Sequence, residues 1–250
     1  MDDDARLTRG QVSAAVGPLG WRLILGAVCA EVDVPSLARA AEAAGIAAAG
    51  AGPDGQDRMT VDVRRDRAVL RLMPPAGGLA TGLEVRLARE VSEALGAHGF
   101  TTAPGLGDRP CGLQGLEIAI DAIDIPAVRP FWQAVTGYVD EHGPSDLTAG
   151  LIDPVGRGPA IWFQQMDEPR GRIGAGGPPA CEGERSDPGN VIRNRIHLDV
   201  DVPHDVAQSR LQAALAAGGT LLDDRAAPAF WVLADPEGNE ACICTWQGRD

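Results

Sequence analysis

The chain has 250 residues, of which 44% are hydrophobic, and its formal net charge is −13 with a pI near 4.7. This length allows one large domain or two small ones. The acidic surface argues against nucleic acid or anionic membrane as a main partner, because both would repel it. The acidic N-terminus lacks the basic segment of a signal peptide, and the five cysteines are scattered without a CxxC pair. We therefore expect a cytoplasmic protein with reduced thiols.

Residues 1–103 form the first predicted unit, an α+β domain with elements in the order αββαββα. Apolar periodicity and turn residues define its elements. They are a helix over 9–17 capped by Thr8, a hairpin of 21–24 and 27–32 turning at Gly26, a helix over 35–45, a hairpin of 58–63 and 68–72, and a helix over 81–97. The Pro- and Gly-rich stretch 104–112 is predicted to be a linker.

Two stretches of the remaining chain, 113–250, repeat each other at an offset of 80 residues. Residues 117–128 read EIAIDAIDIPAV, and residues 197–208 read HLDVDVPHDVAQ. Every second residue at the start of each is apolar, which is typical of a half-buried strand, so Glu117, His197 and Asp199 fall on the polar faces. Each strand runs into an amphipathic helix. Two copies of one unit, each opening with an ionisable side chain, indicate a shared cleft between them.

Each copy is predicted to be one module of strands around a helix. The first has strands near 116–122, 147–152 and 160–166 and a helix at 126–137, and the second has strands near 195–202, 219–223, 229–233 and 240–246 and a helix at 205–217. The connecting segment 167–194 is too long and Gly-rich for an ordinary connection, so it is either a mobile lid or disordered, with disorder favoured. Four tryptophans, at 132, 162, 231 and 246, are expected in the cores, with one or two of them forming an apolar wall of the pocket.

The second unit resembles the glyoxalase/bleomycin-resistance/dioxygenase superfamily, also called vicinal oxygen chelate proteins. The matching text is IDIPAVRPFWQAVTGY (123–138), GPAIWFQQMDEP (158–169), RIHLDVDVPHD (195–205) and FWVLADPEGNEACIC (230–244). The resemblance implies paired βαβββ modules that form a curved sheet around a cleft. It also implies a divalent metal in that cleft, with ligands from the first and last strands of each module.

Carried over by position, the implied first-strand ligands are Glu117 and His197, which suit Zn, Fe, Mn or Ni. On the last strands the equivalent residues are Gln164 or Trp162 in the first module and Cys242 in the second, although the family usually has a glutamate where Cys242 stands. An amide is a poor ligand, and a thiol must first lose its proton. The sequence therefore predicts weak or absent metal in the isolated protein, held, if it binds, by Glu117, His197 and Gln164 or Cys242.

Three functions remain open at this point. In the first, the second unit holds a small molecule in its cleft, with Trp162, Gln164, His197 and Asp199 binding the substrate. A metal there would polarise vicinal oxygens while Glu117 moves a proton, as in a lyase, isomerase or dioxygenase. The second is a non-catalytic protein that sequesters a drug or metabolite. The third is a regulatory protein that forms homo-oligomers through its first unit.

The first unit resembles pterin-4a-carbinolamine dehydratase through GWRLILGAVCAEVDVPSLARAAEAAG (20–45) and VDVRRDRAVLRLMPPAGGLATGLEVRLAREVSEAL (61–95). Dehydration in that family rests on a His-His-Pro run and on a histidine before a Gly-Gly-Leu turn. Here these places read Ala51-Gly52-Pro53 and Met73-Pro74-Pro75, and no histidine precedes His98. Removal of water by acid–base catalysis needs a group that titrates near neutral pH. We therefore expect this unit to lack dehydratase activity.

Overall fold

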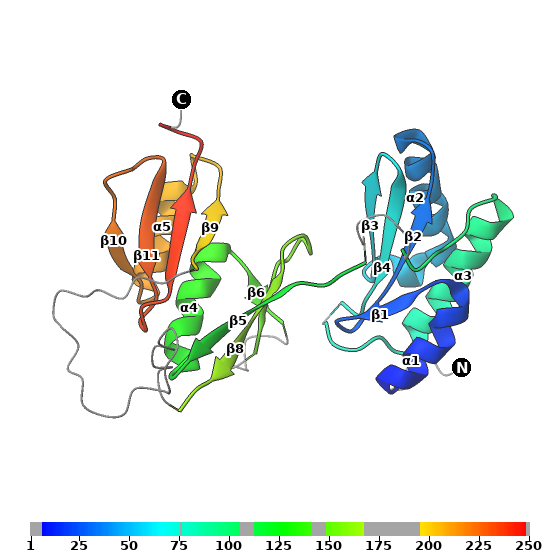
Figure 1. The fold of residues 1–250 in the computed structure, drawn as a ribbon, viewed down its shortest axis with the longest axis horizontal. Helices are drawn as coiled ribbons and strands as arrows, with labels where there is room; N and C mark the ends of the chain where they lie inside the picture. The colour runs from blue at the N-terminus through cyan, green and yellow to red at the C-terminus, as the bar shows by residue number, and fades with distance from the viewer. Residues whose placement is uncertain (1–6, 76, 106–112, 142–148, 168–195, 249–250) are drawn as a thin grey trace, which may run out of the picture. The chain divides into compact units, whose positions relative to one another are not determined.

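The computed structural model describes residues 7–75, 77–105, 113–141, 149–167 and 196–248 (Figure 1). The chain divides into two compact units, Met1–Leu116 and Glu117–Asp250, and each has its own hydrophobic core. Most of the expected linker and all but Asp167 of the segment 167–194 lie outside the described residues. None of the helices in the described ranges is long and apolar enough to cross a bilayer.

The first unit is a four-stranded antiparallel sheet with helices against one face. Its elements are α1 (Arg9–Val16), β1 (Arg22–Ile24), β2 (Ala27–Asp33), α2 (Leu37–Ala51), β3 (Met59–Arg64), β4 (Arg67–Leu72) and α3 (Gly82–Ala97), with short 3₁₀ turns η1 (Gly17–Leu19) and η2 (Pro53–Gly55). The strand order is β1-β2-β4-β3. The helices and strands follow the predicted order, and kinship of this unit with the dehydratases stays a prediction.

Local signals in the sequence account for the boundaries of these elements. Thr8 and Thr81 cap α1 and α3, each in a capping box with the side chain three residues on. The β1–β2 hairpin turns through Leu25 and Gly26, which both have positive φ angles, 47° and 84°. Two consecutive left-handed residues are the signature of a tight hairpin turn that matches the twist of the strands. Gly26 meets this requirement without strain, because it has no Cβ.

The second unit contains two modules, each a four-stranded sheet with one helix. The first comprises β5 (Glu117–Ala122), α4 (Ile125–Thr136), β6 (Val139–Asp140), β7 (Leu151–Ile152) and β8 (Ala160–Gln165), and the second comprises β9 (Leu198–Asp201), α5 (Ala207–Ala216), β10 (Thr220–Asp223), β11 (Phe230–Ala234) and β12 (Glu240–Cys244). The strand orders are β5-β8-β7-β6 and β10-β11-β12-β9. In both modules the first strand pairs in parallel with the last. This is the predicted βαβββ arrangement, and β6 is a short strand that the sequence did not predict.

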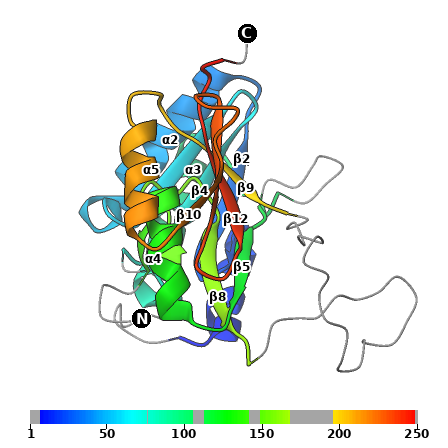
Figure 2. The ribbon, with the colours of Figure 1, turned by 90° about the vertical axis from the view of Figure 1, so that its left-hand side faces the viewer.

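One hydrophobic core joins the two modules. Helices α4 and α5 lie on the same side of the two sheets (Figure 2). Phe131 of α4, Leu211 of α5, Ile161 of β8 and Ile243 of β12 belong to one cluster of buried side chains. Because side chains alternate along a strand, the residues that alternate with the core positions of β5, β8, β9 and β12, among them Glu117, Gln164, Asp199 and Cys242, face away from the helices.

The turn between β11 and β12 ties the second module to the first. The carboxylate of Glu237 accepts hydrogen bonds from the backbone N–H groups of Ile123, at 2.9 Å, and Asp124, at 2.6 Å, just before α4 begins. The buried carboxylate of Asp235 accepts a hydrogen bond of 3.0 Å from Nε1 of Trp132. The sequence predicted a turn here but not this contact between modules.

The four tryptophans were expected in the cores, with one or two of them forming an apolar wall of the pocket, and they differ in how far they are buried. Trp132 is 2% exposed, as expected, whereas Trp162 is 41% and Trp246 is 62% exposed. Trp162 pairs with Ala119 on the sheet face that points away from the helices. Trp246 follows β12 and meets the ring of His204 edge-on, with the ring centroids 5.4 Å apart. These two therefore do not pack in the core: Trp162 lies on the strand face that points away from the helices, and Trp246 lies beyond the end of β12.

Candidate functional site

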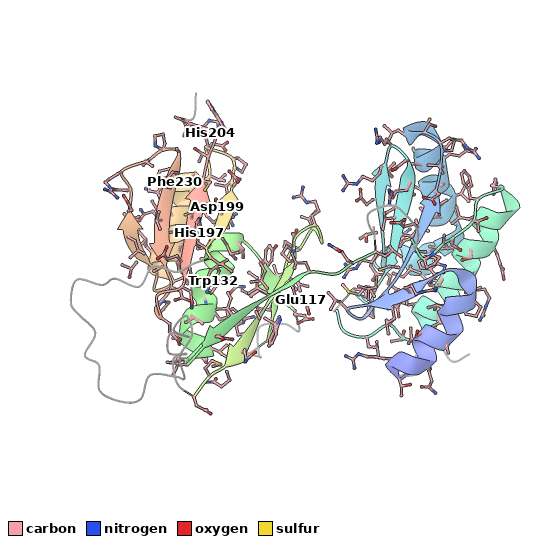
Figure 3. All side chains as sticks on the ribbon, viewed as in Figure 1. Glu117, Trp132, His197, Asp199, His204 and Phe230 are labelled. Carbon is pink, nitrogen blue, oxygen red and sulfur yellow. The ribbon has the colours of Figure 1, made fainter. Side chains whose placement is uncertain are left out.

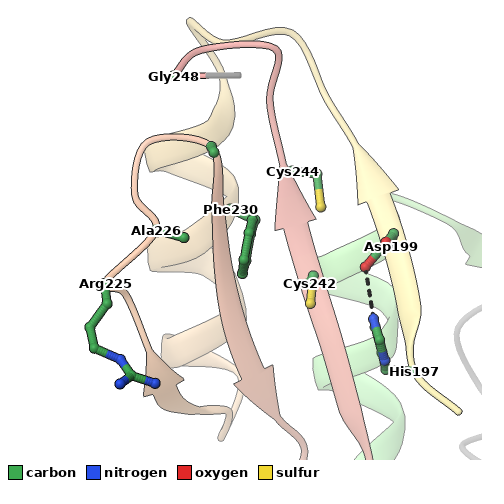
Figure 4. A pocket seen from close by; sticks show the side chains of 9 residues that line it. His197, Asp199, Arg225, Ala226, Phe230, Cys242, Cys244 and Gly248 are labelled. Atoms are coloured by element: carbon green, nitrogen blue, oxygen red, sulfur yellow. Dashed lines mark ion pairs between the residues drawn. The ribbon is translucent and has the colours of Figure 1, made fainter. Parts of the chain in front are cut away.

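Three side chains that can bind a metal gather on the open face of the second sheet. His197 stands directly before β9, Asp199 lies within β9, and Cys242 of β12 is the register partner of Asp199. Paired residues on neighbouring strands point to the same face, and so do residues two apart on one strand. The ligand atoms of all three therefore meet, within 4.8 Å of one another (Figure 4).

The carboxylate of Asp199 lies between the other two groups. Oδ1 of Asp199 is 3.2 Å from Nε2 of His197. The Asp199 carboxylate also accepts a hydrogen bond from the thiol of Cys242. Burial, together with the hydrogen bond to Asp199 and its negative charge, raises the pKa of Cys242 to about 12. The thiol therefore keeps its proton at neutral pH. His197 and Asp199 are exposed, whereas Cys242 is buried, so an incoming ligand meets the imidazole and the carboxylate first.

These side chains open into a cavity of about 780 Å³. Its lining consists of His197, Asp199, Arg225, Ala226, Ala229, Phe230, Cys242, Cys244 and Gly248. Figure 4 shows the Phe230 ring beside Cys242 and Cys244, with Arg225 at the far rim. The guanidinium of Arg225 is held by Asp223, with Nε 2.9 Å from Oδ1. The volume falls in the range of roughly 300–1,000 Å³ that is typical of small-molecule sites.

The residues that the sequence singled out fall on two different sheets. His197, Asp199 and Cys242 line the cavity of the second module. Glu117 begins β5, and Trp162 and Gln164 lie on β8, in the sheet of the first module. Figure 3 shows Glu117 apart from His197 and Asp199. Among the His, Cys, Asp and Glu side chains of the described residues, the structure groups Asp199 with His197 and Cys242, and Glu117 is not in this group.

Two features of the cavity were missed from the sequence. Asp199 was assigned to substrate binding rather than to the metal, although its place two residues after His197 on the same face was a usable signal. Phe230 and Arg225 were not singled out at all. Nothing local marks them, because they reach the cavity through the pairing of β11 with β12 and through the turn after β10.

The grouped donors fit a divalent metal of zinc type. Imidazole nitrogen, carboxylate oxygen and cysteine sulfur are all zinc ligands, and three protein ligands with one open position are typical of catalytic zinc. Zinc–ligand distances of about 2.0–2.3 Å require the donors to approach more closely than 4.8 Å. The two exposed side chains, His197 and Asp199, can supply this movement by changing rotamer. All three of these donors belong to the second module, whereas the resemblance implies ligands from both modules.

Comparison with known proteins identifies the second unit. A glyoxalase-like domain family matches residues 117–244. A glyoxalase/bleomycin resistance protein/dioxygenase family enzyme from Burkholderia phytofirmans PsJN is 23% identical, with a TM-score of 0.35, over 52% of this chain and 95% of that one. A glyoxalase/dioxygenase from Nostoc punctiforme is 16% identical, with a TM-score of 0.38, over 56% and 96%. A fosfomycin resistance protein from Mesorhizobium loti is 11% identical, with a TM-score of 0.35, over 55% and 95%. No curated protein matches. Since the family match spans just over half of its residues, the chain belongs to the glyoxalase-like domain family.

Proposed function

We propose that the second unit binds a small organic molecule in the cavity beside His197, Asp199 and Cys242. Three polar side chains converge on a cavity of about 780 Å³, and the proposal rests on this observation. Small-molecule sites combine apolar walls with a few polar groups that fix the orientation of the ligand. Phe230, Ala226 and Ala229 supply the apolar wall, while His197 and Asp199 supply the polar groups.

A second candidate function is metal-assisted chemistry at the same place, favoured by the donor set. His197, Asp199 and Cys242 would hold the metal, which when bound would act as a Lewis acid on oxygen atoms of the ligand. The Phe230 ring would exclude water from one side of the bound ligand. Proton transfer by Glu117 and substrate contacts by Trp162 and Gln164 stay predictions, because these residues lie on the other sheet.

Ligand-observed NMR with a library of small α-keto acids and vicinal diols tests the binding proposal. We expect binding to the wild type and a loss of about tenfold or more in affinity for Phe230→Ala, because the apolar wall is removed. Val155→Ala is the control, since Val155 is an exposed apolar residue in the first module. Binding that survives both Phe230→Ala and His197→Ala, or no binding of any fragment at millimolar concentration, would refute the proposal.

A further inference from the structure

We propose that the cavity of the second module selects elongated ligands that carry a carboxylate at one end and an ammonium or hydroxyl group at the other. Arg225 binds the carboxylate of the ligand, and Asp199 accepts a hydrogen bond from its opposite end. This inference rests on the proposed function, because it names the class of molecule that the same cavity takes. The two can fail separately, since binding and selectivity are measured apart.

Strand pairing places Arg225 and Asp199 at opposite sides of the second sheet. Asp223 of β10 pairs with Val232 of β11, which pairs with Cys242 of β12. Cys242 in turn pairs with Asp199 of β9. This row spans three strand spacings, which is roughly 14 Å between its outer Cα atoms. Arg225 follows the end of β10 by two residues and lines the cavity together with Asp199. A ligand that touches both charged groups must therefore extend across the sheet.

The guanidinium of Arg225 is held along one edge and open along the other. Its Nε donates to both carboxylate oxygens of Asp223, at 2.9 and 3.0 Å, and its Nη2 donates to the same carboxylate. The planar fork of five N–H donors has a second edge, between Nη1 and Nη2, which faces away from Asp223. Arginine keeps its charge and can bind a carboxylate through two parallel hydrogen bonds. Arg225 is also the one Arg or Lys side chain that the structure describes in the cavity lining, so the carboxylate of a ligand is attracted to this rim.

The Asp199 carboxylate selects the opposite kind of group. It contacts Nε2 of His197 and accepts a hydrogen bond from the thiol of Cys242. An ionised carboxylate has about four lone-pair sites, so it can also accept a hydrogen bond from an N–H or O–H group of a ligand. Its negative charge repels the carboxylate of that ligand. The ligand is therefore oriented with its carboxylate toward Arg225 and its donor toward Asp199.

The wall between these two ends is apolar. Phe230, Ala226 and Ala229 line it, and Figure 4 shows the Phe230 ring between Arg225 and the strand that carries Cys242. An aromatic side chain packs well against a flat ring, and small-molecule sites combine such walls with a few polar groups. A benzene ring or a short alkyl segment therefore suits the middle of the ligand.

A set of probes of nearly equal size tests this selectivity on the full chain at pH 7.5. The compound para-(aminomethyl)benzoate has both end groups, para-methylbenzylamine lacks the carboxylate, and para-methylbenzoate lacks the amine. Titrations followed by ligand-observed NMR give the affinity of each. We expect para-(aminomethyl)benzoate to bind most tightly. Loss of either end group should weaken binding about three- to tenfold, a modest factor because the Arg225 side chain is 88% exposed and exposed charge pairs are weak.

Single substitutions assign each preference to a side chain. Arg225→Gln should abolish the advantage of the carboxylate and leave the affinity for para-methylbenzylamine unchanged. Asp199→Asn should abolish the advantage of the amine without weakening the binding of para-methylbenzoate. Arg64→Gln is the matched control, because Arg64 of the first unit forms a similar exposed pair with Asp62, two residues before it, and this variant should change no affinity.

Equal affinities of para-methylbenzylamine and para-(aminomethyl)benzoate for the wild type would overturn the inference. A preference for the carboxylate that survives Arg225→Gln would overturn it too, as would a failure of all the probes to bind at millimolar concentration. The proposed function is decided separately, because a fragment of any class that binds the wild type and loses affinity in Phe230→Ala leaves that function standing.

Discussion

At the scale of single residues, Glu84 shows how this chain keeps a carboxylate charged inside a core. Burial alone would raise the pKa of Glu84, but hydrogen bonds from Thr81 and Arg58 outweigh it and hold the pKa below its usual value. Glu84 Oε2 accepts from the Thr81 backbone and hydroxyl, both at 2.7 Å, and Oε1 accepts from Arg58. The group that caps α3 therefore also forms an ion pair across the first unit.

The lowered pKa of Glu84 predicts a pH-dependent stability. Because the folded-state pKa lies below the unfolded one, the contribution is complete above the ordinary glutamate pKa and is lost as pH falls through the folded value. Glu84→Gln should lower the free energy of unfolding at pH 7 by roughly 1–3 kcal/mol, and this difference should shrink at low pH. Urea unfolding at a series of pH values measures it. Glu90→Gln on the same helix, in an exposed pair with Arg86, should change the free energy by less than about 1 kcal/mol.

Cys29 illustrates the opposite effect, a buried group that stays neutral. Burial raises the pKa of Cys29 to about 11, although the charge of Arg71 partly lowers it. Since the thiolate is the reactive form, we expect Cys29 to resist iodoacetamide in the folded protein at pH 7.5 and to react promptly in urea. Peptide mass spectrometry reads the extent of labelling. Equal labelling rates in the folded and unfolded chain would contradict this prediction.

At the scale of elements, two features of the β11–β12 turn explain its sequence, DPEG. Gly238 adopts a positive φ of 90°, which ends the turn. Asp235 and Glu237 direct their carboxylates to α4, which belongs to the first module. The turn thus links the helix of one module to the strand that carries Cys242 in the other.

Removing this link should destabilise the second unit. Trp132→Phe keeps the aromatic ring but leaves the buried Asp235 without its indole donor, which should cost about 1–3 kcal/mol. Chemical unfolding followed by circular dichroism measures the change. Trp162→Phe is the matched control, because Trp162 is exposed on the open face and should shift the free energy by less than about 0.5 kcal/mol. Equal effects of the two substitutions would show that the link contributes nothing.

At the scale of the whole molecule, two cores imply two folding units. Because the buried clusters of residues 1–116 and 117–250 are separate, we expect each fragment to fold when expressed alone. Dispersed amide resonances in NMR spectra of both fragments would bear this out, and a fragment that is unfolded where the full chain is folded would contradict it. Formation of homo-oligomers through the first unit stays a prediction, which sedimentation of the 1–116 fragment can test.

The isolated first unit also allows the predicted loss of dehydratase chemistry to be tested. We expect no carbinolamine dehydration by residues 1–116, because neither place of the family's histidines holds a group that titrates near neutral pH. Turnover is followed by the decay of the carbinolamine absorbance, with a working dehydratase as the positive control. Turnover near that of the control would mean that other residues had taken over the acid–base role.

Much of this architecture could be predicted from the sequence, because it depends on local patterns. Alternating apolar residues marked β5 and β9, Thr8 and Thr81 marked helix starts, and Gly26 marked a hairpin turn. Such signals act over a few residues and need no knowledge of distant neighbours. The short strand β6 was missed, since two residues are too few to show a period.

The membership of the candidate site was decided only by the tertiary structure. The sequence placed Glu117 and His197 in one site through a repeat and added Cys242 through the family resemblance, but both show equivalence between positions and not their proximity. Asp199 and Cys242 are far apart in the chain, and they meet because β9 and β12 pair in parallel in one register. The side chains of these two strands that pack in the shared core hold that register. The residues that alternate with them along each strand therefore face the open side of the sheet. The sequence alone therefore determined which strands and helices form, and the packing of the core decided which polar side chains share a cavity.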